Sequence, residues 1–196
     1  ISVTGTGTLS GNTFTQKYDA TTITLTAQAS GNVTAYQWYE DGNVLAGATG
    51  QTYTLSHVAE SGKYTCVVTT DGKEVHTPIM NVVVTKRSLT LTSGTDEKTY
   101  DGTALIKHTV AVTGDGFAAS EGMDYNFTGT ATNVSDTADN NNTFTASFKT
   151  GTAATDYETP VKNYGKLTIN PKEIVITPGF TYSEIPDVVY KAAAYT

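Results

Sequence analysis

The residues of this 196-residue sequence that could carry out chemistry are few and widely separated. Nucleophilic catalysis needs a serine or cysteine beside a base, and the glycine-X-serine-X-glycine pattern of a nucleophile elbow does not occur. A zinc site needs closely spaced ligands, whereas His57, His76 and His108 stand alone. Cys66 precedes two valines, a context typical of a buried, unreactive thiol. We therefore expect no catalytic residue, no metal site and no cofactor.

Two other groups of residues could bind an ion or form a cross-link. The run Ser135–Asn142 offers several oxygen ligands of the kind that calcium prefers, but it lacks the spaced carboxylates and the glycine of a defined calcium loop. We favour a solvated hairpin tip for this run. Lys98, Lys166 and Asn163 are the residues to consider for an amide cross-link between lysine and asparagine, although no diagnostic pattern marks them.

Composition narrows the class of protein. The chain is rich in threonine, tyrosine, valine and glycine, which favours half-buried strands joined by tight turns. Only 16% of the residues are charged, and the net charge of -7 disfavours nucleic acid and anionic membrane surfaces as partners. No apolar run reaches the ~18 residues needed for a membrane span. The sequence begins at Ile1 rather than methionine, and we expect it to be a segment of a longer protein.

Alternating apolar residues predict the strands of a first unit. Ile23, Leu25 and Ala27 alternate with threonines, and Tyr36 and Trp38 share one face of the next strand. Further strands are expected around Tyr53 and Leu55, over Tyr64, Cys66 and Val68, and up to Val82-Val83-Val84, with turns at Asp41-Gly42 and Asp71-Gly72. One face of each strand then contributes to a common core.

The segment Glu60–Cys66, with the single Trp38 upstream, gives this unit a family resemblance. Residues 20–85 resemble an immunoglobulin-like domain of the kind repeated in bacterial surface proteins. The resemblance implies that Gly62 relieves a tight turn, that the Tyr64 hydroxyl satisfies a buried backbone group, and that Cys66 points into the core beside Trp38.

The resemblance also implies that a disulfide has been lost. Ala27 stands where the second cysteine is usual, and the missing cross-link would contribute roughly 4 kcal/mol on the chain-entropy estimate. Hydrophobic burial around Trp38 must then supply more of the stability.

Residues from about 86 to 171 predict a second β unit. Its strands are expected over Ser88–Thr92, around Val110 and Val112, and over Asp124–Thr132, Thr143–Phe148 and Val161–Ile169. The residues expected to build its core are Tyr100, Gly102, Phe144, Phe148 and Tyr164.

Short motifs in this unit resemble the mostly-β YDG repeat domains of large bacterial adhesin-like surface proteins. They are Tyr100-Asp101-Gly102-Thr103, Thr128–Val134, Asn142-Thr143-Phe144, Asn163-Tyr164 and Leu167–Pro171. The resemblance implies a surface-exposed repeat in a tandem array, and it carries over no catalytic residue.

A further repeat is predicted to begin at Lys172. Lys172–Gly179 repeats the pattern of Arg87–Gly94 at an offset of 85 residues, so residues 172–196 start another repeat or form a C-terminal tail. The step from Val84-Thr85 to Lys86-Arg87 contains no glycine- or proline-rich linker, which predicts a short connection that restricts bending.

The sequence thus predicts an all-β protein of two tandem β-sandwich domains, residues 1–85 and 86–171, of which the first is immunoglobulin-like. The leading hypothesis is a non-catalytic extracellular stalk or scaffold on a bacterial cell surface, whose partners are neighbouring repeats of the same chain. The alternative is a module that binds a host protein or a glycan, with Tyr39 available to a partner, or an accessory domain of a secreted polysaccharide-degrading enzyme.

Overall fold

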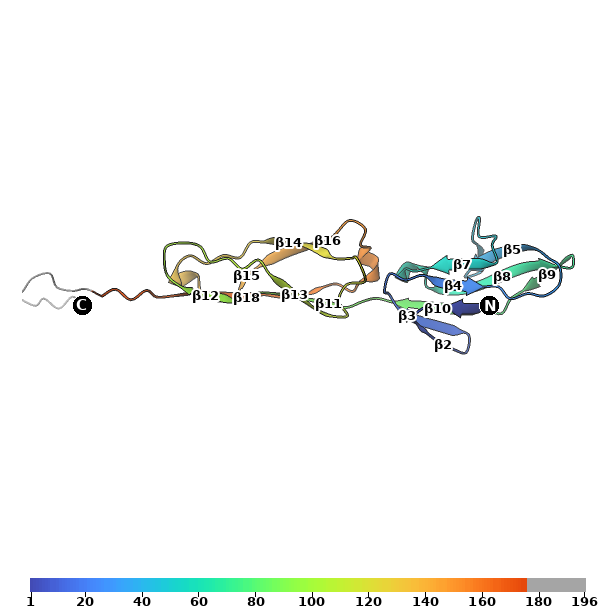
Figure 1. Cartoon of the computed structure of the whole chain (residues 1–196), viewed down its shortest axis with the longest axis horizontal. Helices are drawn as coiled ribbons and strands as arrows, with labels where there is room; N and C mark the ends of the chain where they lie inside the picture. The colour runs from blue at the N-terminus through green and yellow to red at the C-terminus, as the bar shows by residue number, and fades with distance from the viewer. Residues whose placement is uncertain (176–196) are drawn as a thin grey trace, which may run out of the picture.

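The computed structural model describes residues 1–175 and consists of two elongated β units placed end to end (Figure 1). The first unit contains β1 to β10 and the second contains β11 to β18. Three single turns of 3-10 helix interrupt the strands, η1 (Val58–Glu60), η2 (Val134–Asp136) and η3 (Ala154–Asp156). No described helix is long and apolar enough to cross a membrane.

The first unit is a sandwich of two sheets. The smaller sheet has the order β1-β4-β7, formed by Ser2–Thr4, Ile23–Thr26 and Thr52–Leu55. The larger sheet has the order β2-β3-β10-β8-β5-β6, with β9 also paired to β8. Its strands are β2 (Thr8–Ser10), β3 (Thr13–Lys17), β5 (Val33–Glu40), β6 (Asn43–Val44), β8 (Gly62–Thr70), β9 (Lys73–His76) and β10 (Met80–Thr85).

The alternation in the sequence correctly predicts the core of this sandwich. Trp38 and Cys66 are directly opposite each other on β5 and β8, and both are fully buried. Ala27 is also fully buried, so the two positions that a disulfide would join are both filled by small hydrophobic groups. This arrangement confirms an immunoglobulin-like sandwich without a cross-link.

The expected hydrogen bond from the Tyr64 hydroxyl to the backbone, known as a tyrosine corner, is present. The role of Gly62 differs from the prediction. The Tyr64 hydroxyl donates to the carbonyl oxygen of Glu60 at 2.6 Å, and the Glu40 carboxylate lies 2.9 Å away as an alternative acceptor. Gly62 does not occupy the left-handed region that tight turns use. A Cβ atom at Gly62 would lie 2.9 Å from Glu40 Oε1, so the glycine makes room for this carboxylate.

The second unit is built from three small sheets. β11 (Leu89–Ser93) lies between β13 (Val110–Gly114) and β17 (Val161–Asn163), and β18 (Gly165–Asn170) lies between β12 (Asp96–Thr99) and β15 (Ala138–Asn142). The antiparallel pair of β14 (Met123–Phe127) and β16 (Phe144–Phe148) forms the opposite layer (Figure 1). Phe144 is buried between the layers, with Phe148 and Tyr164 partly buried against the same core. The all-β, two-sandwich fold is confirmed.

Three expectations for the second unit are wrong. Tyr100 is 39% exposed and Gly102 is exposed as well, so neither belongs to the core among the described residues. Residues 138–142 of the predicted hairpin tip form strand β15, and Asn142 is fully buried. The single strand expected over 161–169 is broken at Tyr164, because β17 pairs with β11 whereas β18 pairs with β12.

A buried polar node explains this break. The Ser93 hydroxyl donates to the carbonyl oxygen of Asn142 at 2.6 Å and accepts the Gly165 N–H at 2.9 Å. The Asn142 amide donates to the carbonyl oxygens of Gly94 and Lys107 at 2.8 and 2.9 Å. These side chains supply partners to backbone groups where strands pass from one sheet to the next.

The further repeat predicted from Lys172 lies largely outside the described residues. Residues 172–175 are described, and no strand is assigned to them.

Replacing Tyr64 by phenylalanine should destabilise the first unit by about 1–3 kcal/mol, because the Glu60 carbonyl and Glu40 carboxylate lose a buried donor. The measurement is urea unfolding followed by fluorescence of the single Trp38. Tyr39→Phe is the matched control, with an expected change below about 0.5 kcal/mol. Equal midpoints for the two variants would contradict the corner's role.

Candidate functional site

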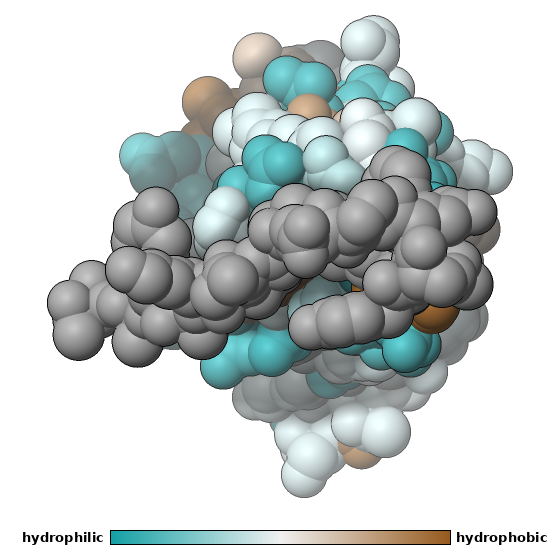
Figure 2. Space-filling view, turned by 90° about the vertical axis from the view of Figure 1, so that its left-hand side faces the viewer, coloured by the Kyte–Doolittle hydropathy of each residue, from teal (hydrophilic) through white to brown (hydrophobic). Residues whose placement is uncertain are grey.

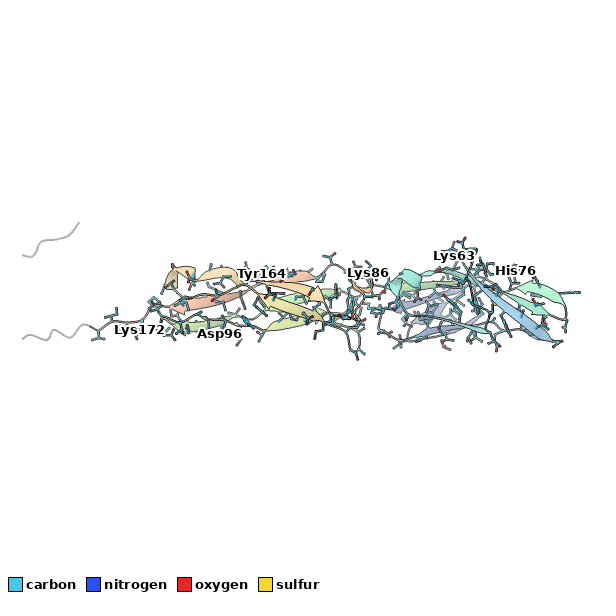
Figure 3. All side chains as sticks on the ribbon, turned by 90° about the horizontal axis from the view of Figure 1, so that it is seen from above. Lys63, His76, Lys86, Asp96, Tyr164 and Lys172 are labelled. Atoms are coloured by element: carbon cyan, nitrogen blue, oxygen red, sulfur yellow. The ribbon has the colours of Figure 1, made fainter. Side chains whose placement is uncertain are left out.

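Charged and hydrogen-bonding side chains connect the two units where they meet. We call this region, formed around Tyr18, His57, Arg87, Glu121 and Asp156, the junction. The connecting chain runs from β10 through Lys86 into β11, and in Figure 3 Lys86 lies between the two units. Its shortness places the end of the first sandwich against the near end of the second.

Arg87 ties the connecting chain to both units. Its guanidinium donates to the carbonyl oxygen of Tyr18 in the first unit at 2.9 Å. The same group donates to the carbonyl oxygen of Gly116 at 2.8 Å and to that of Asp115, both in the second unit. A planar fork with several fixed donors suits this task, since one side chain holds three carbonyl groups at defined angles.

Asp115 provides a charged contact at the edge of the junction. Its carboxylate lies 2.5 Å from Lys17 Nζ of the first unit and accepts the N–H of Ser88 at 2.8 Å. The hydrogen bond from Lys17 holds the pKa of the Asp115 carboxyl well below its usual range. Asp115 is therefore ionised at neutral pH and contributes a cross-unit ion pair.

Tyr18 forms the buried centre of the junction. This side chain from the first unit is 2% exposed, and its hydroxyl donates to Glu121 Oε1 of the second unit at 2.6 Å. The Tyr157 hydroxyl donates to the other oxygen of Glu121, and the two tyrosine rings meet edge to face with centroids 5.9 Å apart. Burial and the hydrogen bond to Glu121 raise the pKa of Tyr157 to about 12. Both tyrosines are thus neutral donors.

His57 and Asp156 form a second contact between the units. His57 Nδ1 lies 2.6 Å from Asp156 Oδ2, and the Val58 N–H donates to Asp156 Oδ1 at 2.8 Å. Asp156 is fully buried, whereas the His57 side chain is 48% exposed and stacks on Tyr18. One carboxylate of the second unit thereby satisfies the N-terminal end of η1 in the first unit.

The apolar residues beneath these contacts form one continuous cluster. It extends from Trp38 and Val82 of the first unit through Tyr18 to Leu89, Tyr157 and Phe144 of the second. The two sandwiches therefore share buried surface instead of ending in separate solvated faces.

Sequence reasoning missed Tyr18, although a signal was present. Tyr18-Asp19-Ala20-Thr21 has the same tyrosine-aspartate-X-threonine order as Tyr100-Asp101-Gly102-Thr103, the first of the motifs that resemble YDG repeats. The alanine in place of glycine hides the match, although Ala20 adopts the same left-handed backbone as Gly102, with φ of 62° and 79°.

The other candidate residues lie apart from one another and form no common site among the described residues. Cys66 is buried and its pKa is raised by that burial, as expected of an inert thiol. His108 stacks on Phe127 with ring centroids 4.7 Å apart. Lys98 pairs with Asp101 at 2.8 Å, and Lys166 pairs with Asp139 at 3.0 Å. Within residues 1–175, no group of three or more histidine, cysteine or acidic side chains could hold a metal ion.

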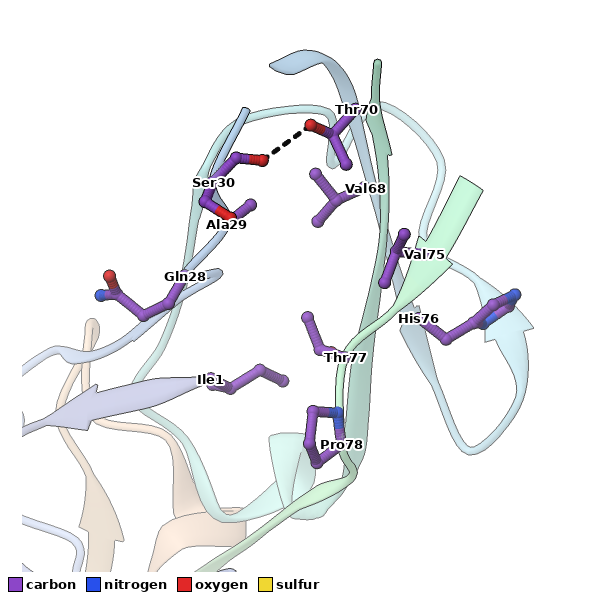
Figure 4. Close-up of a pocket in the computed structure, with 10 residues that line it drawn as sticks. All are labelled: Ile1, Gln28, Ala29, Ser30, Val68, Thr70, Val75, His76, Thr77 and Pro78. Carbon is purple, nitrogen blue, oxygen red and sulfur yellow. Dashed lines mark hydrogen bonds between the residues drawn. The ribbon is translucent and has the colours of Figure 1, made fainter. Parts of the chain in front are cut away.

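A hollow of about 520 Å³ lies at the other end of the first unit, lined by residues that include Ile1, Gln28, Ser30 and Thr70 (Figure 4). The Thr70 hydroxyl already donates to the carbonyl oxygen of Ser30 at 2.8 Å. His76 points away from the hollow. The hollow thus offers a shallow surface with few free polar groups.

No family model matches the chain, and none of the curated proteins matches it. Solved structures that match include "Sidekick-1 immunoglobulin domains 1-5", with 13% identity, a TM-score of 0.34 and coverage of 79% of this chain and 35% of that chain. Another is "Sidekick-1 immunoglobulin domains 1-4, crystal form 1", with 12% identity, a TM-score of 0.33 and coverage of 83% and 46%. This chain spans less than half of the length of either.

The His57 imidazole should titrate above the ordinary histidine value of ~6.5, because the hydrogen bond to Asp156 favours its charged form. Since the folded-state pKa is raised, this stabilisation is fully present below about pH 6.5 and is lost as the pH rises through the folded pKa. NMR titration of the ring protons measures the value. Asp156→Asn should lower the pKa of His57.

Asp139→Asn is the control, because Asp139 contacts Lys166 away from the junction. An equal pKa of His57 in the wild type and in Asp156→Asn would contradict the contact.

Proposed function

We propose that this chain is a non-catalytic stalk or scaffold segment of an extracellular, adhesin-like protein on a bacterial cell surface. The support for the bacterial surface setting is the resemblance of residues 86–171 to YDG repeats and of residues 20–85 to bacterial immunoglobulin-like domains. The role is mechanical: the two sandwiches act as a stiff spacer, and their partners are neighbouring repeats of the same chain.

The junction is the observation that carries this proposal. Bending at the junction would expose Tyr18 and leave the buried Asp156 carboxylate without the Val58 N–H and His57. Leaving one buried hydrogen-bonding group unsatisfied costs about 1–3 kcal/mol, and more when the group is charged. Several such losses would occur together, so the extended arrangement is strongly preferred.

The strand pairing within each unit also suits a spacer under tension. In the first unit the early strand β3 pairs in parallel with the last strand β10, from Thr13 opposite Asn81 to Lys17 opposite Thr85. In the second unit β12 pairs in parallel with the last strand β18. Pulling the early and last strands of such a pair in opposite directions loads all of their hydrogen bonds together, so no single bond breaks first.

A glycan- or protein-binding role is the second candidate, and the hollow beside Ile1 and Thr70 is the observation that favours it. Screening the chain on a glycan array tests this alternative. Strong, reproducible hits that disappear when Thr70 is replaced by a bulky residue would favour binding over the spacer role.

Spin labels at Thr34→Cys and Thr145→Cys, one on each unit, should give a single narrow distance distribution by double electron–electron resonance. Both positions are exposed, whereas Cys66 is buried and stays unlabelled. The double substitution Arg87→Ala with Asp156→Ala should broaden the distribution, because it removes contacts across the junction. Lys166→Ala with Asp139→Ala, away from the junction, is the matched control. A broad distribution in the unaltered protein would refute the stiff spacer.

A further inference from the structure

The local structure that docks the first unit onto the second occurs again at the far end of the second unit. The first copy starts with Tyr18, whose N–H donates to the carbonyl oxygen of Thr85 at 2.9 Å. The second starts with Tyr100, whose N–H donates to the carbonyl oxygen of Asn170 at 2.8 Å. Thr85 and Asn170 end β10 and β18 and are separated by the same 85-residue offset as the repeated sequence pattern that follows them.

The residues after each tyrosine form the same turn. Asp19 Oδ1 accepts the N–H of Thr21 at 3.0 Å, and Asp101 Oδ1 accepts the N–H of Thr103 at 2.9 Å. The hydroxyl of each threonine donates to the same aspartate oxygen. Tyr18 directly follows β3 and Tyr100 directly follows β12, and the backbone after each tyrosine has the same turn conformation.

A 3-10 turn stands beside the tyrosine in both copies. Glu60 Oε2 accepts the N–H groups of Ser56 and His57 at 2.6 and 2.7 Å, which fixes η1. In the second copy, the carboxylate that fixes η2 is that of Asp136, which accepts the N–H groups of Thr132 and Asn133 at 2.9 and 2.8 Å.

Each 3-10 turn is attached to the last strand of its unit through the hydroxyl that follows it. Ser61 Oγ accepts the N–H of Val84 in β10 at 2.9 Å. Thr137 Oγ1 accepts the N–H of Ile169 in β18 at 2.8 Å. Val84 and Ile169 are again separated by 85 residues, so turn, hydroxyl and strand correspond in both copies.

The two copies differ in what covers them. Tyr18 is 2% exposed under the second unit, whereas Tyr100 is 39% exposed. The Val58 N–H is bound by Asp156, but among residues 1–175 no acceptor is found for the N–H of Val134, whose residue is 44% exposed. The second copy thus has the same turn, tyrosine and 3-10 turn as the first, but no described unit is packed against it.

The residues that follow the last strand of each unit also differ in exposure between the two copies. Leu89 is 2% exposed in the second unit, and its counterpart at the 85-residue offset, Ile174, is 81% exposed. A hollow of about 370 Å³ lies here, lined by Tyr100, Asn133, Val134, Pro171, Lys172 and Ile174. Figure 2 looks along the long axis of the molecule onto this end.

We propose that this end, with Tyr100 and Val134 at its centre, is a docking platform for a further module of the same kind as residues 86–171, joined directly after Pro171. The docked module would bury Tyr100, present a carboxylate to its hydroxyl as Glu121 does to Tyr18, and present a second carboxylate to the Val134 N–H as Asp156 does to Val58. The inference rests on the proposed spacer function and specifies how a spacer of this kind is extended.

The test is a three-module chain in which residues 1–171 are followed by a second copy of residues 87–171. Tyrosines are nitrated with tetranitromethane under native conditions, and the modified positions are mapped by mass spectrometry, with the 196-residue chain as reference. Tyr18 should be protected in both proteins, and Tyr100 should react in the reference. In the three-module chain the first Tyr100 should become at least ~10-fold less reactive, whereas the Tyr100 of the added copy at the free end should stay reactive.

Unchanged reactivity of the first Tyr100 would overturn the proposal, and so would failure of the added copy to fold on this platform. Protection of Tyr100 in the reference chain that grows with protein concentration would assign the surface to self-association instead. Val134→Asp in the three-module chain should restore the reactivity of the first Tyr100, because a carboxylate there repels the docking carboxylates. All of these outcomes leave the stiffness of the first junction unaffected, so failure here is distinguishable from failure of the spacer function.

Discussion

The burial of Tyr18 between the two sandwiches is the constraint on which the arrangement of this molecule depends. Its ring fills the space between the units, and its hydroxyl reaches Glu121 of the second unit. A buried tyrosine needs a partner for its hydroxyl, and the partly buried Glu121 carboxylate supplies that partner. Because Tyr157 donates to the same carboxylate, the second unit can satisfy both conditions in only a narrow range of orientations.

The contacts around Tyr18 further restrict how the two units can be oriented. Arg87 holds carbonyl groups of both units from within the connecting chain. Asp156, whose backbone carbonyl accepts the Arg87 N–H, binds the N-terminal end of η1 with its carboxylate. Because Arg87, Asp156 and Tyr18 each hold a different group of the other unit, a rotation that relieves one contact strains another. Stiffness therefore follows from the placement of the contacts more than from the strength of any one of them.

Local patterns in the sequence were sufficient for the sandwich cores and insufficient for the junction. Alternation correctly placed Trp38 in the core, and the Tyr64 motif correctly predicted a corner hydrogen bond. Tyr18 could not be found from alternation, since its partner Glu121 lies 103 residues away in the sequence. Asn142 lies in an asparagine-rich run typical of loops, and only the distant carbonyl groups of Gly94 and Lys107 make its burial favourable.

The central claim is that the two units form one rigid body, and residual dipolar couplings of backbone amides test it most directly. The couplings of the first unit and of the second are fitted separately to the structure, each giving its own alignment tensor. A rigid junction predicts two tensors of equal magnitude and common orientation. A clearly weaker alignment of one unit, or tensors that differ in orientation, would show that the units move independently and would contradict the account.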